Sequence, residues 1–446
     1  MSETLTVSES KAAPDKLRFP QFVTEGARVL SPPALRLFGA GIQFLSTVMI
    51  ARQLGDVNSA VFFFWAAILT SFAPIATYGL EHLALRAVPR LHHAGETDRL
   101  VSYLASIRTV SLVLSLLIGV GLVLYAVLRD GPDSIHFQLW YLLLPIALAS
   151  MALVHINGES LKGLAKPVNG IFFGHFVPVS LFCLLIATNL DRLSSPFLIV
   201  IYSLAYVAAV VLIRVGSSSL LRAKTFAKPD KAQFRDILGE GFPVFASNAL
   251  GALCFIVPLM ILDFSRPAAE VAYVTTSFRI SILFMILAGA IHGVFAPQLS
   301  RAAIHTENPS GIWKVYRRAT LLTMLSLLIP MGVGIAFPGF VMSIFGEEFR
   351  AGASTLRLLL LASFLTLCLG PMMHLLLMTG NTRLLARLGL FKLLLVGLLS
   401  LLVVPSLGGI GMVSAMGCVF LIEAAAGLLL VNRRFGKPSP ANPIKP

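Results

Sequence analysis

Windows of about 20 apolar residues recur from the N-terminal quarter of the chain to its last twenty residues. A helix needs a window of this length to cross the roughly 30 Å hydrocarbon core of a bilayer. Of the 446 residues, 57% are hydrophobic and 13% are charged, whereas soluble domains carry roughly 25% charged residues. A soluble fold of this size could not bury so much apolar surface, so we expect the bilayer to surround most of the chain.

The length of these windows indicates helices, because a transmembrane β-barrel would show alternating segments of roughly ten residues. We therefore predict an all-α integral membrane protein of about twelve transmembrane helices. The predicted spans are 33–51, 60–85, 100–128, 138–157, 168–188, 196–213, 239–262, 271–299, 319–343, 355–378, 384–404 and 408–431.

The formal net charge of +14 could suggest a nucleic-acid partner, but the distribution of the charge indicates membrane topology instead. Lys and Arg in short loops collect on the cytoplasmic side of a membrane. One alternating set of connections, with the two termini, carries 27 Lys and Arg residues and the opposite set carries six. This asymmetry predicts that both termini lie in the cytoplasm and gives no reason to expect nucleic acid. The four cysteines all fall inside apolar spans without metal-ligand spacing, so we expect neither a disulfide nor a metal site.

The longest connection divides the predicted spans into two sets of six. Because six spans return the chain to its starting side, the halves would be parallel repeats around a central cavity. The predicted organisation is a cytoplasmic segment 1–29 without the features of a signal peptide, a six-helix bundle 30–213, a cytoplasmic linker 214–238, a second six-helix bundle 239–432 and a cytoplasmic tail 433–446.

Four short segments then point to a known family. They are Ala51-Arg52-Gln53-Leu54-Gly55 with Ala60-Val61-Phe62, Val271-Ala272-Tyr273 through Phe295-Ala296-Pro297-Gln298-Leu299-Ser300-Arg301, Phe345-Gly346-Glu347-Glu348-Phe349 with Leu356-Arg357, and Pro405-Ser406-Leu407-Gly408-Gly409-Ile410-Gly411. Together they resemble the polysaccharide transporters of the multidrug/oligosaccharidyl-lipid/polysaccharide exporter superfamily over roughly residues 30 to 432. The resemblance implies a flippase that moves an undecaprenyl-pyrophosphate-linked oligosaccharide from the cytoplasmic to the periplasmic leaflet of the bacterial inner membrane.

A pyrophosphate that crosses hydrocarbon needs cations on its path, and charged residues inside a membrane are rarely placed there without use. Arg279 lies about 12 Å along its helix from the external side, too deep to reach water easily. Guanidinium binds phosphate through paired hydrogen bonds. We therefore take Arg279 as the first candidate for substrate binding, with Arg36 and Arg52 of the first span as further candidates. A structural ion pair, or a side chain that reaches back to the membrane surface, is the alternative for each.

The acidic and histidine residues near the spans are candidates for coupling or gating. Glu81 and His82 lie near the cytoplasmic end of the second span, and Glu423 is the deepest acid of the last span. Pairing at the membrane interface or across helices is the competing interpretation of all three. We expect no cofactor, and a proton or a sodium gradient stays open as the energy source.

Two other classes of protein compete with a flippase. A cation-coupled multidrug exporter of the same superfamily would tend to carry a carboxylate in its first helix, but this span has Arg36 and no acid between Val29 and Ala51. A membrane enzyme such as a polysaccharide polymerase would need a large external loop, and all the predicted external connections are short. For a flippase, the cargo could be an O-antigen, capsule or exopolysaccharide unit, and its polymerase and assembly proteins would be the partners.

Overall fold

The computed structural model describes residues 19–130, 139–216, 231–304, 309–369 and 382–435, and every element within these ranges is helical. Ten of the described helices are long and apolar enough to cross a membrane. This confirms the predicted all-α membrane architecture. The physical reason is that a helix satisfies all its backbone hydrogen bonds internally, which hydrocarbon requires.

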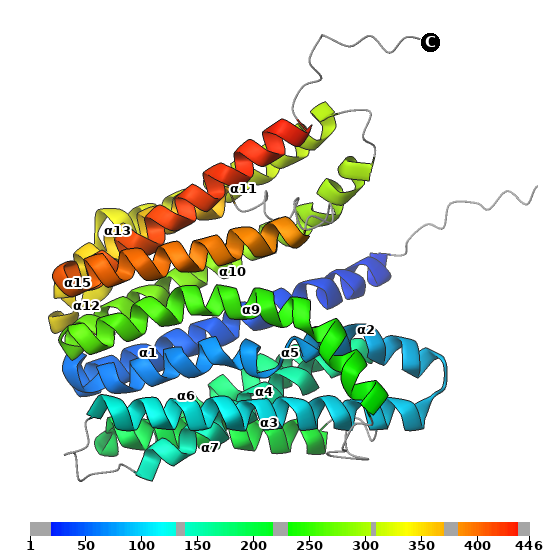
Figure 1. Ribbon diagram of the computed structural model, residues 1–446, viewed down its shortest axis with the longest axis horizontal. Coiled ribbons are helices and arrows are strands. Elements are labelled where there is room, and N and C mark those ends of the chain that lie inside the picture. The colour runs from blue at the N-terminus through cyan, green and yellow to red at the C-terminus, as the bar shows by residue number, and fades with distance from the viewer. Residues whose placement is uncertain (1–18, 131–138, 217–230, 305–308, 370–381, 436–446) are drawn as a thin grey trace, which may run out of the picture.

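The helices of the two halves form two groups that lie against each other (Figure 1). The first half contains α1 (Phe19–Ala76), α2 (Leu80–His93), α3 (Thr97–Asp130), η1 (Leu139–Leu142), α4 (Leu143–Gly163), α5 (Pro167–Ile171), η2 (Phe172–Phe176), α6 (Val177–Ala187), η3 (Leu190–Arg192) and α7 (Ser195–Gly216). The second half contains α9 (Lys231–Ser265), α10 (Ala268–Ile304), α11 (Pro309–Ala336), α12 (Pro338–Ser343), η4 (Glu347–Gly352), α13 (Ala353–Leu369) and α15 (Thr382–Phe435).

Two of these helices turn back on themselves at a glycine. In α1 the turn is at Gly55, with φ 71° and ψ −178°, and in α15 it is at Gly408, with φ 58° and ψ −136°. Figure 1 shows the two parts of each helix running side by side. A positive φ is strained for residues with a Cβ, which is why glycine occupies both positions. Counting both as hairpins would give twelve passes, but the count of twelve and the orientation stay predictions.

The described helix bounds differ from the predicted ones in two ways. The predicted span 60–85 is interrupted, because α1 ends at Ala76 and α2 begins at Leu80 after a turn in which Tyr78 and Gly79 have φ of 57° and 72°. Polar helix ends also extend beyond the apolar windows. Thus α1 already begins at Phe19, α7 continues to Gly216, α9 begins at Lys231 and α15 ends at Phe435. The break between the halves is therefore shorter than the predicted linker 214–238, and the division into two repeats stays a prediction.

The second pass of α1 lies at the centre of the first half. Its residues Phe62, Phe63, Phe64 and Trp65 are almost completely buried. The Phe62 ring packs against Phe182 of α6 and Tyr202 of α7, and the Phe64 ring packs against Tyr125 of α3. Helix α1 as a whole also contacts α10 and α9 of the second half. Helix α1 therefore joins the two halves, and residues between its passes and α9 and α10 lie where a central site would be.

A central cavity and the contacts that close it

A cavity of about 110 Å³ lies between the two halves. Helices α1, α6 and α7 contribute one side of its lining, and α9 and α10 contribute the other. Its polar lining residues are Gln43, Ser46, Thr47, Thr70, Ser71, Tyr202, Tyr206, Thr275 and Arg279. The volume is well below the roughly 300–1,000 Å³ of pockets that hold drug-sized ligands, so the cavity in this structure is too small for such a ligand.

Arg279 is the charged residue of this lining. Its Nη1 donates a hydrogen bond to Thr47 Oγ1 at 3.3 Å, and its guanidinium lies 5.1 Å from the centre of the Phe63 ring. The hydroxyls of Tyr202 and Tyr206 are its electrostatic neighbours. Among the described residues, no carboxylate forms an ion pair with Arg279. The predicted cation therefore lies at the cavity, held by neutral groups, with its positive charge uncompensated.

The hydroxyls of the lining present mainly hydrogen-bond acceptors to the cavity. The hydroxyls of Ser46, Thr47, Thr70 and Thr275 each donate to the carbonyl four residues earlier in their own helix, at 2.7 to 2.9 Å. Because a hydroxyl has one proton and two lone pairs, its lone pairs remain for a ligand that donates. The site combines one cation with acceptor oxygens, which suits a ligand that carries both an anionic group and hydroxyls.

Aromatic rings complete the lining, and sequence reasoning did not identify them. Tyr202 and Tyr206 are four residues apart in α7, so they share one helix face, and their rings are 5.0 Å apart. Phe182 of α6 packs edge-on against Tyr202 at 5.0 Å. The spacing of the two tyrosines, and the adjacent hydroxyls of Ser46 with Thr47 and of Thr70 with Ser71, were the signals in the sequence that could have found this site.

The two halves also meet beyond the cavity, near the Gly55 and Gly408 turns, which is the external end in the predicted orientation. Asp263 at the end of α9 pairs with Arg129 of α3 at 2.7 Å, and its side chain is only 3% exposed. Tyr273 of α10 donates to Asp56 Oδ2 at 2.5 Å. Arg52 Nε donates to the carbonyl of Ile344 at 2.8 Å. These residues, Arg52, Asp56, Arg129, Asp263, Tyr273 and Ile344, are called the external contact below.

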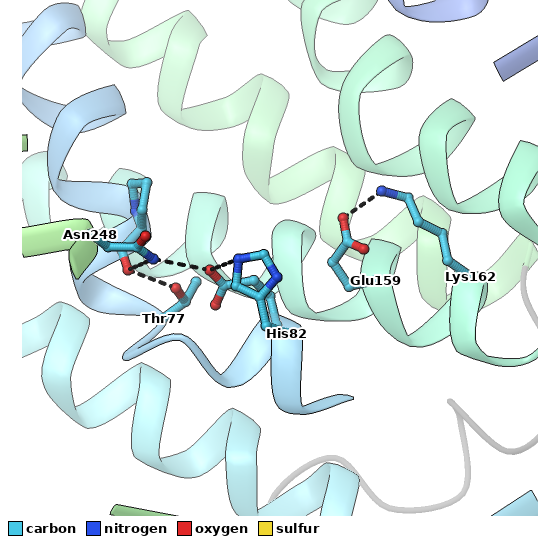
Figure 2. Close-up of polar contacts among 7 residues, drawn as sticks. Thr77, His82, Glu159, Lys162 and Asn248 are labelled. Atoms are coloured by element: carbon cyan, nitrogen blue, oxygen red, sulfur yellow. Dashed lines mark hydrogen bonds and ion pairs between the residues drawn. The ribbon is translucent and has the colours of Figure 1, made fainter. Parts of the chain in front are cut away.

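On the other side of the cavity, the α1–α2 turn meets α9. The Tyr78 ring stacks on Phe245 with 4.6 Å between centres. Asn248 Nδ2 lies 3.5 Å from both the Pro74 carbonyl and Glu81 Oε1 (Figure 2). Nε2 of His82 is 3.8 Å from the same Glu81 oxygen. Pro74, Tyr78, Gly79, Glu81, Val244, Phe245 and Asn248 are called the cytoplasmic contact below, after the predicted orientation. The cavity thus lies between two contacts that join the halves.

The structure brings Arg279 to the cavity, but not the other two predicted arginines. Arg36 is exposed and has His175 of η2 as an electrostatic neighbour. Arg52 belongs to the external contact, where it binds a backbone carbonyl. The described residues therefore do not place one arginine from each half in the cavity. Arg52 lies close to the Gly55 turn, and Arg36 lies at the start of the apolar stretch of α1, which begins at Ala34. From either place a long side chain can reach the membrane surface.

The predicted coupling residues separate as well. Glu81 and His82 belong to the cytoplasmic contact region, whereas Glu423 lies in the second half, where Lys392 Nζ contacts its two oxygens at 3.1 and 3.0 Å. This is the pairing across helices that was the alternative for Glu423. Among the described residues, no group of three or more His, Cys, Asp or Glu side chains could hold a metal ion.

Several solved structures share this fold. The lipid II flippase MurJ in an inward closed conformation superimposes with a TM-score of 0.71 at 14% identity, covering 90% of this chain and 87% of MurJ. An inward-facing multidrug resistance MATE family transporter of the MOP superfamily gives 0.68 at 16% identity, covering 90% and 94%. The fold and the cavity between two helical halves define a multi-pass membrane protein with the architecture of these transporters.

The family follows from the sequence match. Residues 30–303 match the family model described as polysaccharide biosynthesis protein, and the chain belongs to that family. The probable low-salt glycan biosynthesis flippase Agl15 of Haloferax volcanii is 27% identical over 328 residues. That match covers 72% of this chain and 66% of the Haloferax protein.

Proposed function

We propose that the protein is a flippase that carries undecaprenyl-pyrophosphate-linked oligosaccharide units across the bacterial inner membrane by alternating access. The unit would serve the synthesis of a surface polysaccharide, whether O-antigen, capsule or exopolysaccharide, and a polymerase with its assembly proteins would consume it. The family, and a relative described as a glycan biosynthesis flippase, support transport of a glycan rather than an enzymatic reaction.

The uncompensated charge of Arg279 is the observation that carries the proposal. A guanidinium without a carboxylate partner, held at the cavity by Thr47 and Phe63, favours an anionic ligand. The acceptor oxygens and aromatic rings around it suit sugar hydroxyls and sugar faces. The cavity is too small for the proposed cargo, and contacts join the halves on both sides of it. Substrate entry therefore requires one contact to open. Alternating access adds that the other contact stays closed at that time, so that no continuous path crosses the membrane.

A cation-coupled drug exporter is the second candidate, because it would share the fold. Such a protein needs an acid where the cationic drug binds, and the described lining of the cavity contains Arg279 and no carboxylate. An arginine without an acid repels cations. The charge of the cavity therefore favours the flippase over the exporter.

Deletion of the gene with complementation tests the proposal. The deletion strain should lose surface polysaccharide and accumulate lipid-linked intermediates in the cytoplasmic leaflet, and the wild-type gene should restore the polymer. Arg279→Ala should fail to restore it at equal protein level. Arg350→Ala, which removes an exposed arginine paired with Glu347 in η4, is the matched control and should complement fully.

Two outcomes would contradict the proposal. Normal surface polymer in the deletion strain together with new sensitivity to cationic drugs would favour the exporter. Full complementation by Arg279→Ala would show that the buried cation does not handle the cargo.

A further inference from the structure

The cytoplasmic contact is built from unusually close packing. Gly79 has φ 72°, and a Cβ there would lie 2.6 Å from Cβ of Val244 in α9. A Cβ at Gly241 would lie 2.8 Å from the Tyr78 ring, and Tyr78 itself has φ 57°, a conformation that costs a residue with a side chain free energy. The backbone of the α1–α2 turn is thus held directly against a helix of the other half. A small separation of the halves here would break the whole contact.

Glu81 is the ionisable group of this contact. It is 9% exposed, and its Oε1 is 3.5 Å from the amide of Asn248, while its Oε2 is buried without a hydrogen-bond partner. A buried carboxylate oxygen without a donor is costly when charged and much less so when it carries a proton. Burial raises the pKa of the Glu81 carboxyl above its ordinary range; the Thr77 hydroxyl, its own backbone N–H and His82 lower it, and Glu159 raises it.

The charged groups around Glu81 do not neutralise its carboxylate in the closed contact. His82 is half exposed, and Glu159 of α4 is engaged by Lys162 (Figure 2). On α3, the Ser111 hydroxyl donates to the Ala76 carbonyl, and Arg108, one turn earlier, donates to Asn157 Oδ1 at 2.9 Å. Helix α9 presents the neutral amide of Asn248, with Glu240 two turns earlier in the chain. Among these described contacts, the exposed His82, 3.8 Å from Glu81 Oε1, is the group that can pair with the Glu81 carboxylate, and it does so only when it is itself protonated.

We propose that Glu81 is a proton-binding site and that its protonation closes the cytoplasmic contact between the halves. In the closed contact Glu81 is buried against α9, and opening would expose it to water, where its charged form is stabilised. The closed state therefore binds the proton more tightly, so closure is favoured as the pH falls and opening as it rises. The proton is taken from water and returned to water, and no other group is consumed. This inference rests on the alternating access of the proposed function, but not on the identity of the cargo.

Distance measurements between spin labels test this proposal without a glycan. Labels at Arg90→Cys in α2 and Arg317→Cys in α11, with the four native cysteines replaced, would report the separation of the halves in purified full-length protein in lipid nanodiscs. Between pH 8 and pH 5 the population should move from a longer to a shorter distance, with a midpoint above the ordinary range of a glutamate. Glu81→Gln, which resembles the neutral acid, should hold the short distance at every pH.

Matched variants make the result specific. His82→Gln and Glu159→Gln should keep the transition, because they remove neighbouring titratable groups and leave Glu81 in place. Asn248→Leu should lower the midpoint, because it removes the amide from the closed contact, and it serves as the second test if Glu81→Gln is unstable. A Glu81→Gln protein that titrates like the wild type, or a transition lost in His82→Gln, would overturn the assignment. Since the measurement contains no glycan, such a failure would leave the proposed cargo untouched.

Discussion

At the scale of single residues, the protein uses charged side chains inside the membrane in two different ways. Arg279 faces a cavity without a carboxylate partner, whereas Lys392 and Glu423 neutralise each other within the second half. Lys392 also lies 5.3 Å from the centre of the Phe420 ring. A paired charge stabilises the fold only while both partners are present, since an isolated buried charge is costly. The two kinds of charge therefore predict different responses to substitution.

Breaking the Lys392–Glu423 pair should destabilise the protein more than removing it. We expect Lys392→Met or Glu423→Gln alone to cost about 3–5 kcal/mol, and the double variant Lys392→Met/Glu423→Leu to recover much of this loss. Thermal unfolding of the detergent-purified protein measures both. Glu347→Gln, which breaks the exposed Arg350–Glu347 pair, is the control and should change stability by less than about 1 kcal/mol. A single variant as stable as the wild type would mean that the pair contributes nothing.

At the scale of elements, the start of α10 holds both helical turns at the external end. Tyr273 binds Asp56 directly after the Gly55 turn. Three residues before it, Glu270 accepts a hydrogen bond from the Gly409 N–H at 2.8 Å and pairs with Arg266 at 2.6 Å. A carboxylate at the first N–H groups of a helix satisfies donors that the helix itself cannot. The N-terminal end of α10 therefore holds the first residues of the second pass of α1 and of the second pass of α15.

The two turn glycines should differ in their tolerance of alanine. At Gly55 a Cβ would meet only Glu348 Oε1 at 3.4 Å, an ordinary contact, so Gly55→Ala adds the cost of a positive φ, roughly 1–2 kcal/mol. At Gly408 a Cβ would lie 1.8 Å from Glu270 Oε2, so the carboxylate must also move away from Gly409. We expect Gly408→Ala to lose about 1–3 kcal/mol more than Gly55→Ala in thermal unfolding. Equal losses would show that the Glu270 bond does not hold the turn.

Much of the fold was accessible from the sequence, because hydrophobic length and loop charge reflect direct demands of the bilayer. The helical class and Arg279 at the cavity were predicted from these demands. The break after Ala76 was not predicted, although Pro74 and Gly79 flank it and both residue types interrupt helices, because the apolar window continues across them. Nor were the Asn248–Glu81 and Arg129–Asp263 contacts, which join residues 167 and 134 positions apart. Such pairs depend on how the two halves pack against each other, and this packing cannot be predicted from a single sequence.

At the scale of the whole molecule, the cavity lies between two regions in which the halves touch. The external contact contains a buried ion pair and hydrogen bonds, whereas the cytoplasmic contact depends on ring stacking and close backbone packing. The two contacts therefore respond to different substitutions. This permits each to be weakened without the other.

Weakening the external contact should open the cavity to the outside. We expect Arg129→Ala together with Tyr273→Phe to increase, by tenfold or more, the rate at which Thr70→Cys at the cavity reacts with a membrane-impermeant maleimide applied externally. The background is a variant without native cysteines, and Arg350→Ala is the control that should leave the rate unchanged. If the rate does not rise in the double variant, these bonds do not close the external side.

The predicted orientation has a direct test of its own. Tags placed at the N-terminus and the C-terminus should both resist protease in intact spheroplasts and both be digested in inverted vesicles, because the loop cations place both ends in the cytoplasm. Digestion of either tag in intact spheroplasts would contradict the even number of passes or their direction.

The lone charge of Arg279 finally has an electrical consequence. A pyrophosphate diester carries more negative charge than one arginine can balance, so an occupied cavity would remain net negative. A membrane voltage, negative inside, contributes about 2.3 kcal/mol per charge for each 100 mV crossed. It would drive such a complex outward. With a second cation in the cavity the complex would be neutral and the voltage would contribute nothing, whereas without any cation both negative charges would enter the membrane uncompensated. One unpaired arginine therefore lowers the electrostatic cost of the loaded cavity and still leaves a net charge on which the resting voltage can do work.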